Sequence, residues 1–130
     1  MSSNQQSSAK ESLCGPAHQT VEQALEHAFR NIGRPVTQPL RGTKTNRLSN
    51  AGRVIGFQTA DGKARVRLDF DPNKGLHVNE EDYTRPPHLQ KVVHLVEAVA
   101  SPMNEEAQVM LLNWQENRML LFWNKWTSRF

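Results

Sequence analysis

The chain of 130 residues has little of several features that mark particular classes of protein. Its single cysteine, Cys14, excludes a disulfide within the chain and a cysteine-based metal site. No apolar run approaches the roughly 18 residues of a membrane-spanning helix, and the polar N-terminus lacks the apolar core of a secretory signal. The five histidines show no His-Glu-x-x-His or comparable ligand spacing. The sequence therefore predicts a soluble, cytosolically made chain with no cofactor and no metal site.

Acidic side chains are scarce in the middle of the chain. Residues 30–67 hold nine Lys or Arg residues and a single acid, Asp61, although the net charge of the whole chain is only +3. A local basic stretch of this kind is compatible with a nucleic-acid partner. Within it, a loop rich in Pro, Gly and Thr is predicted over residues 34–52, and three of its basic residues are candidate contacts to RNA phosphates: Arg41, Lys44 and Arg47.

The pattern of apolar residues predicts an α+β fold. Residues 1–19 are a Ser/Gln-rich arm that we expect to be disordered, and residues 20–130 form a single α+β domain. We expect an N-terminal helix from Val21 to Gly33, a small antiparallel sheet of about four strands and a long C-terminal helix packed on the sheet. The predicted strands cover residues 53–59, 64–70, 76–81 and 91–96, and the last helix covers about 105–125.

The C-terminal helix contains all three tryptophans of the chain. A cover for the apolar side of the sheet is the simpler interpretation, because four strands alone cannot bury a core. Aromatic residues mixed with Arg118 and Lys125 also suit a helix that binds a protein partner or a membrane surface. The sequence leaves both roles open.

Two turns predict the strand registers. Asp61-Gly62 is a hairpin signal, and residues 71–75 (Asp-Pro-Asn-Lys-Gly) form a turn typical of Pro, Asn and Gly. The first turn places Gly56 opposite Arg67, where the missing side chain leaves room for Arg67 or a substrate. The second turn predicts four cross-strand pairs, of which the last three point away from the core: Phe70–Leu76, Asp69–His77, Arg67–Asn79 and Arg65–Glu81.

The stretch 62–82, GKARVRLDFDPNKGLHVNEED, resembles a motif near the C-termini of bacterial polymorphic toxins. These are the variable tips of Rhs-type and contact-dependent-inhibition proteins, and several are similar to the barnase-like and RelE-like ribonuclease fold. The resemblance implies an RNA endonuclease with tRNA or ribosomal RNA as target, delivered into the bacterial cytoplasm as part of a secreted effector. It also implies neutralisation by a cognate immunity protein. The matching residues are Arg67, Asp69, Asp71, Pro72, Lys74, Gly75, His77, Asn79, Glu81 and Asp82.

Metal-independent RNA cleavage needs a base, an acid and cations around the phosphate. His77 is the predicted base or acid, because imidazole titrates near neutral pH, and Asp69 is placed to orient it. Arg67 is predicted to hold the phosphate. The proton-transfer partner of His77 could be Glu81, His88 or Tyr83. Beyond the four catalytic candidates His77, Asp69, Arg67 and Glu81, we expect RNA contacts from Arg65, Lys74, Asn79, Tyr83, Arg85 and His88.

Two other functions stay open at the level of sequence. One is a non-enzymatic nucleic-acid-binding or adaptor module that uses the basic loop and the Trp-rich helix. The other is a toxin tip with metal-dependent DNase or nucleotide-modifying activity, in which Asp69, Asp71 and Glu81 would be metal ligands. His94 is expected to be a structural residue of its strand, and His18 and His27 are not expected to be functional.

Overall fold

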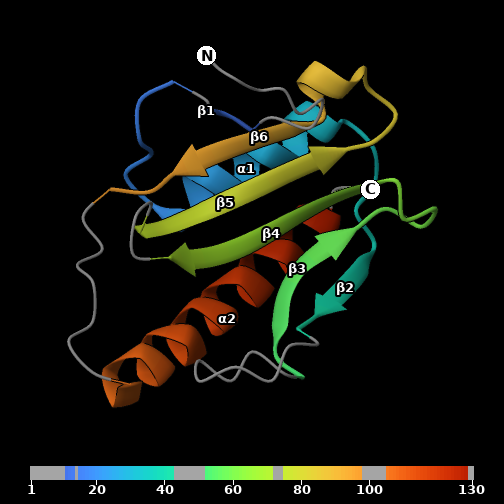
Figure 1. Cartoon of the computed structure of the whole chain (residues 1–130). Coiled ribbons are helices and arrows are strands. Elements are labelled where there is room, and N and C mark those ends of the chain that lie inside the picture. Colours follow the sequence, from blue (N-terminus) through green and yellow to red (C-terminus); the bar gives the residue numbers. More distant parts are fainter. Residues whose placement is uncertain (1–10, 14, 43–51, 72–74, 98–104, 129–130) are drawn as a thin grey trace.

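A computed structural model shows an α+β architecture and describes residues 11–13, 15–42, 52–71, 75–97 and 105–128 (Figure 1). Within these ranges, two helices, one short 3-10 helix and six strands follow one another. In order, they are β1 (Glu11–Leu13), α1 (Val21–Ile32), β2 (Gln38–Arg41), β3 (Val54–Gln58), β4 (Ala64–Asp71), β5 (Gly75–Asp82), η2 (Pro87–Leu89), β6 (Lys91–Leu95) and α2 (Glu105–Thr127).

The strands form one mixed sheet in the order β1-β6-β5-β4-β3-β2. The prediction of about four strands is wrong by two, because β1 and β2 lie in segments for which no strand is predicted. β1 pairs in parallel with β6, and β2 pairs antiparallel with β3 across an irregular register near Leu40. Both added strands are short and lie at the two edges of the sheet.

Helix α1 begins and ends where the sequence predicts. The side chain of Thr20 accepts a hydrogen bond from the backbone N–H of Gln23, which satisfies one free donor of the first turn. At the other end Gly33 adopts a left-handed conformation with φ of 66°, and its N–H donates to the carbonyl oxygen of Phe29.

The predicted register of the central hairpin is confirmed. β4 and β5 pair so that Asp69 lies opposite His77, Arg67 opposite Asn79 and Arg65 opposite Glu81. Gly56 of β3 lies opposite Arg67, also as predicted. Since side chains alternate along a strand, the sheet has a helix side, which carries the alternate residues such as Val66 and Val78, and an outer side.

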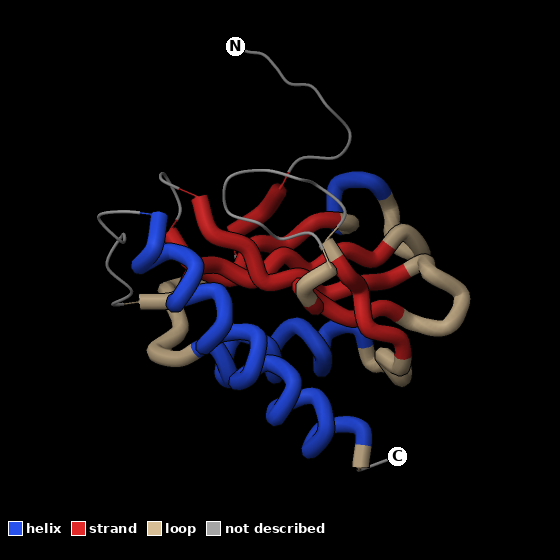
Figure 2. The backbone as a smooth tube through the Cα atoms, turned by 90° about the horizontal axis from the view of Figure 1, so that it is seen from below, coloured by secondary structure: helices blue, strands red, loops and turns tan. Residues whose placement is uncertain are grey.

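Both helices lie on the same side of the sheet (Figure 2). The core is apolar and joins α1 to α2 through aromatic contacts. The ring of Phe57 stacks on Trp123 at a centroid distance of 4.8 Å, and Phe29 meets Trp126 edge-on at 5.7 Å. Trp123 Nε1 also donates to the carbonyl oxygen of Val36 at 2.8 Å. α2 is therefore a cover for the apolar side of the sheet.

Helix α2 keeps a second, exposed apolar stripe. Met110, Trp114 and Leu121 are each more than half exposed, and the guanidinium of Arg118 lies 4.3 Å from the centroid of the Trp114 ring. Within the described ranges, neither α1 nor α2 combines the length and apolar character needed to cross a membrane.

Gly56 permits the close approach of β3 and β4. A Cβ atom at this position would lie 2.1 Å from the carbonyl oxygen of Val66 and 2.8 Å from the Cα of Arg67. Both neighbours belong to the backbone, so no side-chain rotation relieves the overlap. The absent side chain is therefore needed by the sheet itself, rather than by the side chain of Arg67 or by a substrate.

We predict that Gly56→Ala lowers the free energy of unfolding by about 1–3 kcal/mol or more, because β3 must move away from β4. Chemical denaturation followed by circular dichroism measures this loss. Gln58→Ala, two residues along the same strand and partly exposed, is the control and should change stability by less than about 0.5 kcal/mol. Equal effects of the two substitutions would contradict the role given to Gly56.

Candidate nucleic-acid interface

The outer side of the β4–β5 hairpin carries a row of charged side chains. Glu81 lies between two guanidinium groups, with its Oε1 2.9 Å from Arg65 Nε and its Oε2 3.5 Å from Arg67 Nη2. Arg67 Nη1 is also 3.7 Å from Asp69 Oδ2. The sheet therefore gathers two cations and two carboxylates into one alternating row, as the register predicts.

His77 and Asn79 stand beside this row on β5. The Nδ1 atom of His77 lies 2.9 Å from the carbonyl oxygen of Gly75, which can only accept, so Nδ1 carries a proton and donates it. In the neutral ring Nε2 then carries the lone pair. The Nδ2 atom of Asn79 donates to Asp69 Oδ2 at 2.5 Å. The backbone of Gly75 thus contributes to the orientation of His77, and Asp69 binds Asn79.

The outer side is less open than the sequence suggests. We expected a solvent-exposed face, but His77 is only 3% exposed and Asn79 only 7%. The side chains of Arg65 and Arg67 remain 37% and 31% exposed. A ligand therefore reaches the two guanidinium groups before it reaches the imidazole.

Three buried polar atoms on this face have no hydrogen-bond partner among the residues that the structure describes: Arg65 Nε, Arg67 Nε and Asn79 Oδ1. Arg65 Nε is in an ion pair with Glu81. Arg67 Nε is a donor and Asn79 Oδ1 an acceptor, and both belong to residues that contact Asp69. A buried polar atom without a partner costs about 1–3 kcal/mol. Such atoms require an explanation, and a catalytic or ligand-binding role is one of those known in proteins.

The other predicted RNA contacts are spread more widely. Tyr83 is 41% exposed, and its ring centroid lies 5.9 Å from the guanidinium carbon of Arg65, so the structure brings it to the same face. His88 is exposed on η2, and Arg41 is exposed on β2, where its Nη1 donates to the carbonyl oxygen of Gly52. Lys74, Lys44 and Arg47 lie outside the described residues.

Arg85 faces the helix side instead. Its Nη1 lies 2.7 Å from Glu80 Oε2, and its Nη2 donates to the carbonyl oxygen of Asn31 at the end of α1. Arg85 therefore holds α1 against β5, and the structure does not place it in one groove with His77.

The helix side of β5 contains two buried carboxylates. Glu80 accepts hydrogen bonds from Asn31, Arg85 and His94, and Asp82 accepts from both terminal nitrogens of Arg34 at 3.1 and 3.3 Å. Burial alone would raise the pKa of each carboxyl group, but the hydrogen bonds outweigh it and hold both pKa values below their ordinary range. Both groups are therefore ionised inside the fold.

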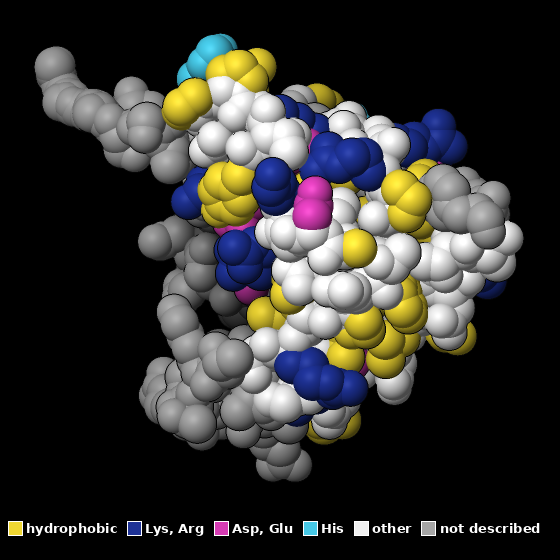
Figure 3. Space-filling view, turned by 90° about the vertical axis from the view of Figure 1, so that its right-hand side faces the viewer, with side chains coloured by type: hydrophobic (Ala, Val, Ile, Leu, Met, Phe, Trp, Pro, Cys, Tyr) yellow, Lys and Arg dark blue, Asp and Glu magenta, His cyan; other side chains and the backbone are white. Residues whose placement is uncertain are grey.

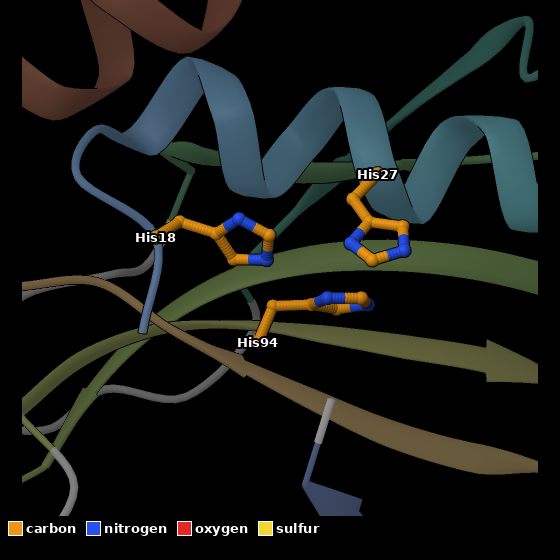
Figure 4. Close-up of side chains that lie close together, drawn as sticks. All are labelled: His18, His27 and His94. Atoms are coloured by element: carbon orange, nitrogen blue, oxygen red, sulfur yellow. The ribbon is translucent and has the colours of Figure 1, made fainter. Parts of the chain in front are cut away.

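Three histidines from separate segments meet beside this network (Figure 4). His18 precedes α1, His27 lies on α1 and His94 lies on β6, and their ring centroids are 5.0–5.5 Å apart. Burial lowers the pKa of His18, and the two neighbouring rings lower it further because they disfavour a second positive charge. Each residue offers one ring nitrogen, and these nitrogens all lie within 4.8 Å of one another.

Sequence reasoning missed this cluster because its members lie 9 and 67 residues apart along the chain. Residues so far apart form no local sequence motif that would predict their contact. The one available signal is that His94 is polar at a position of β6 that faces the core, since it pairs with Val78.

We predict that Asp82→Asn lowers the free energy of unfolding by about 1–3 kcal/mol near neutral pH, because it removes a charged acceptor of two guanidinium hydrogen bonds. The pKa of Asp82 is lowered in the fold, so its stabilisation is complete above its ordinary value of 3.8 and disappears as the pH falls through the folded value. Denaturation at several pH values should therefore show the variant and the parent converging below about pH 4. A difference that stays constant down to low pH would contradict ionisation of Asp82.

The chain matches no protein-family model and no curated protein. The resemblance of residues 62–82 to toxin tips therefore rests on the residues of that motif.

Proposed function

We propose that this protein is a bacterial toxin domain that cleaves RNA without a metal ion, at the outer face of β4 and β5. The observation that supports it best is a pair of buried atoms, Arg67 Nε and Asn79 Oδ1, which lack a hydrogen-bond partner within the described part of the chain and lie beside the oriented imidazole of His77. A guanidinium N–H can donate to a phosphate oxygen, and an amide oxygen can accept from a base or a 2′-hydroxyl group.

In the proposed reaction, Nε2 of His77 takes the proton of the ribose 2′-hydroxyl group, whose oxygen then attacks the adjacent phosphorus. The 5′-oxygen leaves with a proton, for which Tyr83 is the candidate donor, and the product is a 2′,3′-cyclic phosphate. Arg65 and Arg67 stabilise the negative charge that builds on the phosphate oxygens. Glu81 orients the two guanidinium groups, since it lies between them.

Surface charge supports an RNA substrate. On the side shown in Figure 3, Lys and Arg side chains are spread over the surface and few acidic side chains stand among them. The exposed ring of Tyr83 offers a surface on which a base can stack. In this proposal, the target is tRNA or ribosomal RNA in the bacterial cytoplasm, and an immunity protein with acidic side chains would neutralise the domain by covering Arg65 and Arg67.

A second candidate function is RNA binding without cleavage. The burial of His77 favours it, because an imidazole that is 3% exposed is poorly accessible to a ribose. In that case Arg65, Arg67 and Tyr83 would bind RNA, and His77 would hold β5 in place through its bond to Gly75.

We expect His77→Ala to reduce cleavage of bacterial RNA by about 10²–10⁴-fold, as loss of a general base does, while RNA binding changes little. Purified protein is incubated with total bacterial RNA in EDTA, and circular dichroism in the same buffer checks that parent and variant stay folded. Asn117→Ala, which changes an exposed side chain of α2 outside the proposed site, is the control and should keep full activity.

Each outcome of this assay decides between the two candidates. Unchanged cleavage by His77→Ala would overturn the catalytic role of His77. Intact RNA with the folded parent protein would overturn the metal-independent ribonuclease. Retention of RNA binding in that case, with a loss on Arg67→Ala, would support the binding module.

A further inference from the structure

The cluster of His18, His27 and His94 has the properties of a metal site, and we propose that it binds one Zn²⁺ ion on the helix side of the sheet. This site lies on the opposite side of the sheet from the proposed RNA-cleaving face and is independent of it. Imidazole nitrogens are common ligands of Zn²⁺, and a set of three leaves one position of a tetrahedron open.

The ligand atoms are close to the required geometry. In a tetrahedral site with Zn–N distances of about 2.0–2.1 Å, the nitrogens lie roughly 3.4 Å apart. The three nitrogens here are within 4.8 Å of one another, so small rotations of the side chains bring them into place. Figure 4 shows the rings of His18 and His27 side by side, with the ring of His94 next to both.

Two of these nitrogens need a partner. His94 is fully buried, and its Nδ1 has no hydrogen-bond partner within the described parts of the chain; the same holds for Nε2 of His18. The edge-on and tilted contacts between the rings explain their proximity but give neither atom a hydrogen-bond partner. A metal ion satisfies both at once, because each neutral ring offers it a lone pair.

Glu80 prepares His94 for this role. Its Oε1 lies 2.7 Å from His94 Nε2, so Nε2 donates its proton to the carboxylate and the lone pair is left on Nδ1. Asn31 and Arg85 hold the carboxylate of Glu80 in turn. A carboxylate that binds the far nitrogen of a histidine ligand is the usual outer contact of protein zinc sites.

The backbone of His18 is also fixed. Its N–H donates to the carbonyl oxygen of Leu95 at 2.8 Å, and its carbonyl oxygen accepts from the N–H of Glu97 at 2.7 Å. These bonds hold the segment before α1 against β6, next to His94. A bound ion would therefore join three elements: the segment at His18, helix α1 and strand β6.

His18 and His27 line a surface hollow of about 300 Å³. Its walls also include Gln23, Glu26 and Arg30 of α1. Water can therefore complete the coordination, as in zinc sites that keep an open position. Mg²⁺ and Ca²⁺ prefer oxygen ligands, so the three imidazoles discriminate against both ions.

The test is a titration of the untagged full chain with Co²⁺, whose visible absorption reports tetrahedral coordination, followed by displacement with Zn²⁺. We expect one equivalent of metal to bind and Mg²⁺ to compete poorly. Competition with a chromophoric chelator measures the affinity for Zn²⁺, which His27→Ala should weaken by more than about 100-fold. His88→Ala is the control, and its affinity should equal that of the parent protein.

Glu80→Gln tests the hydrogen bond between Glu80 and His94. We expect this substitution to lower the affinity for Zn²⁺ by about 10–100-fold. Thermal denaturation shows whether each variant is folded, and Zn²⁺ should raise the melting temperature of the parent protein but not that of His27→Ala. Absence of tetrahedral Co²⁺ absorption in the parent protein would overturn the site. Equal Zn²⁺ affinity of the folded His27→Ala variant and the parent would overturn it as well.

Discussion

Burial of β5 on both sides is the constraint on which the rest of the structure depends. Seven of the eight residues of this strand are buried, and five of those seven are polar or charged. A buried charge is tolerated only when it is paired and hydrogen-bonded. Neighbouring elements must therefore bring partners to β5, and the placement of α1, of Arg85 and of the arginines on β4 follows from this need.

On the helix side, Glu80 shows how strongly one carboxylate organises its surroundings. It binds Asn31 of α1, Arg85 of the segment after β5 and His94 of β6. Removing one partner of a buried pair costs about 3–5 kcal/mol, so each contact restrains the element that supplies it. The same carboxylate also sets the proton position on His94 and so prepares the proposed zinc site.

Local chemistry made a large part of this fold predictable. The registers of β3, β4 and β5 follow from the turns around Asp61-Gly62 and at residues 71–75, because a short turn leaves few ways to pair the flanking strands. The ends of α1 follow from Thr20 and Gly33. The charged row on the outer face, from Arg65 to Asp69, could be predicted for the same reason.

The features that escaped prediction depend on contacts between distant segments. β1 is three residues long and pairs with β6, about 80 residues later, and β2 contains Pro39, which argues against a strand. The burial of His77, the helix-side position of Arg85 and the meeting of three histidines also depend on tertiary packing. No pattern within a short window of sequence contains that information.

The parallel pairing of β1 with β6 has a consequence for synthesis of the chain on the ribosome. The hairpins of β3, β4 and β5 can form as soon as they emerge, but β1 must wait for the arrival of β6. The apolar side of the sheet is covered later still, since Trp123 and Trp126 of α2 are synthesised after every strand. During translation, this domain therefore exposes a half-covered sheet until its last helix emerges.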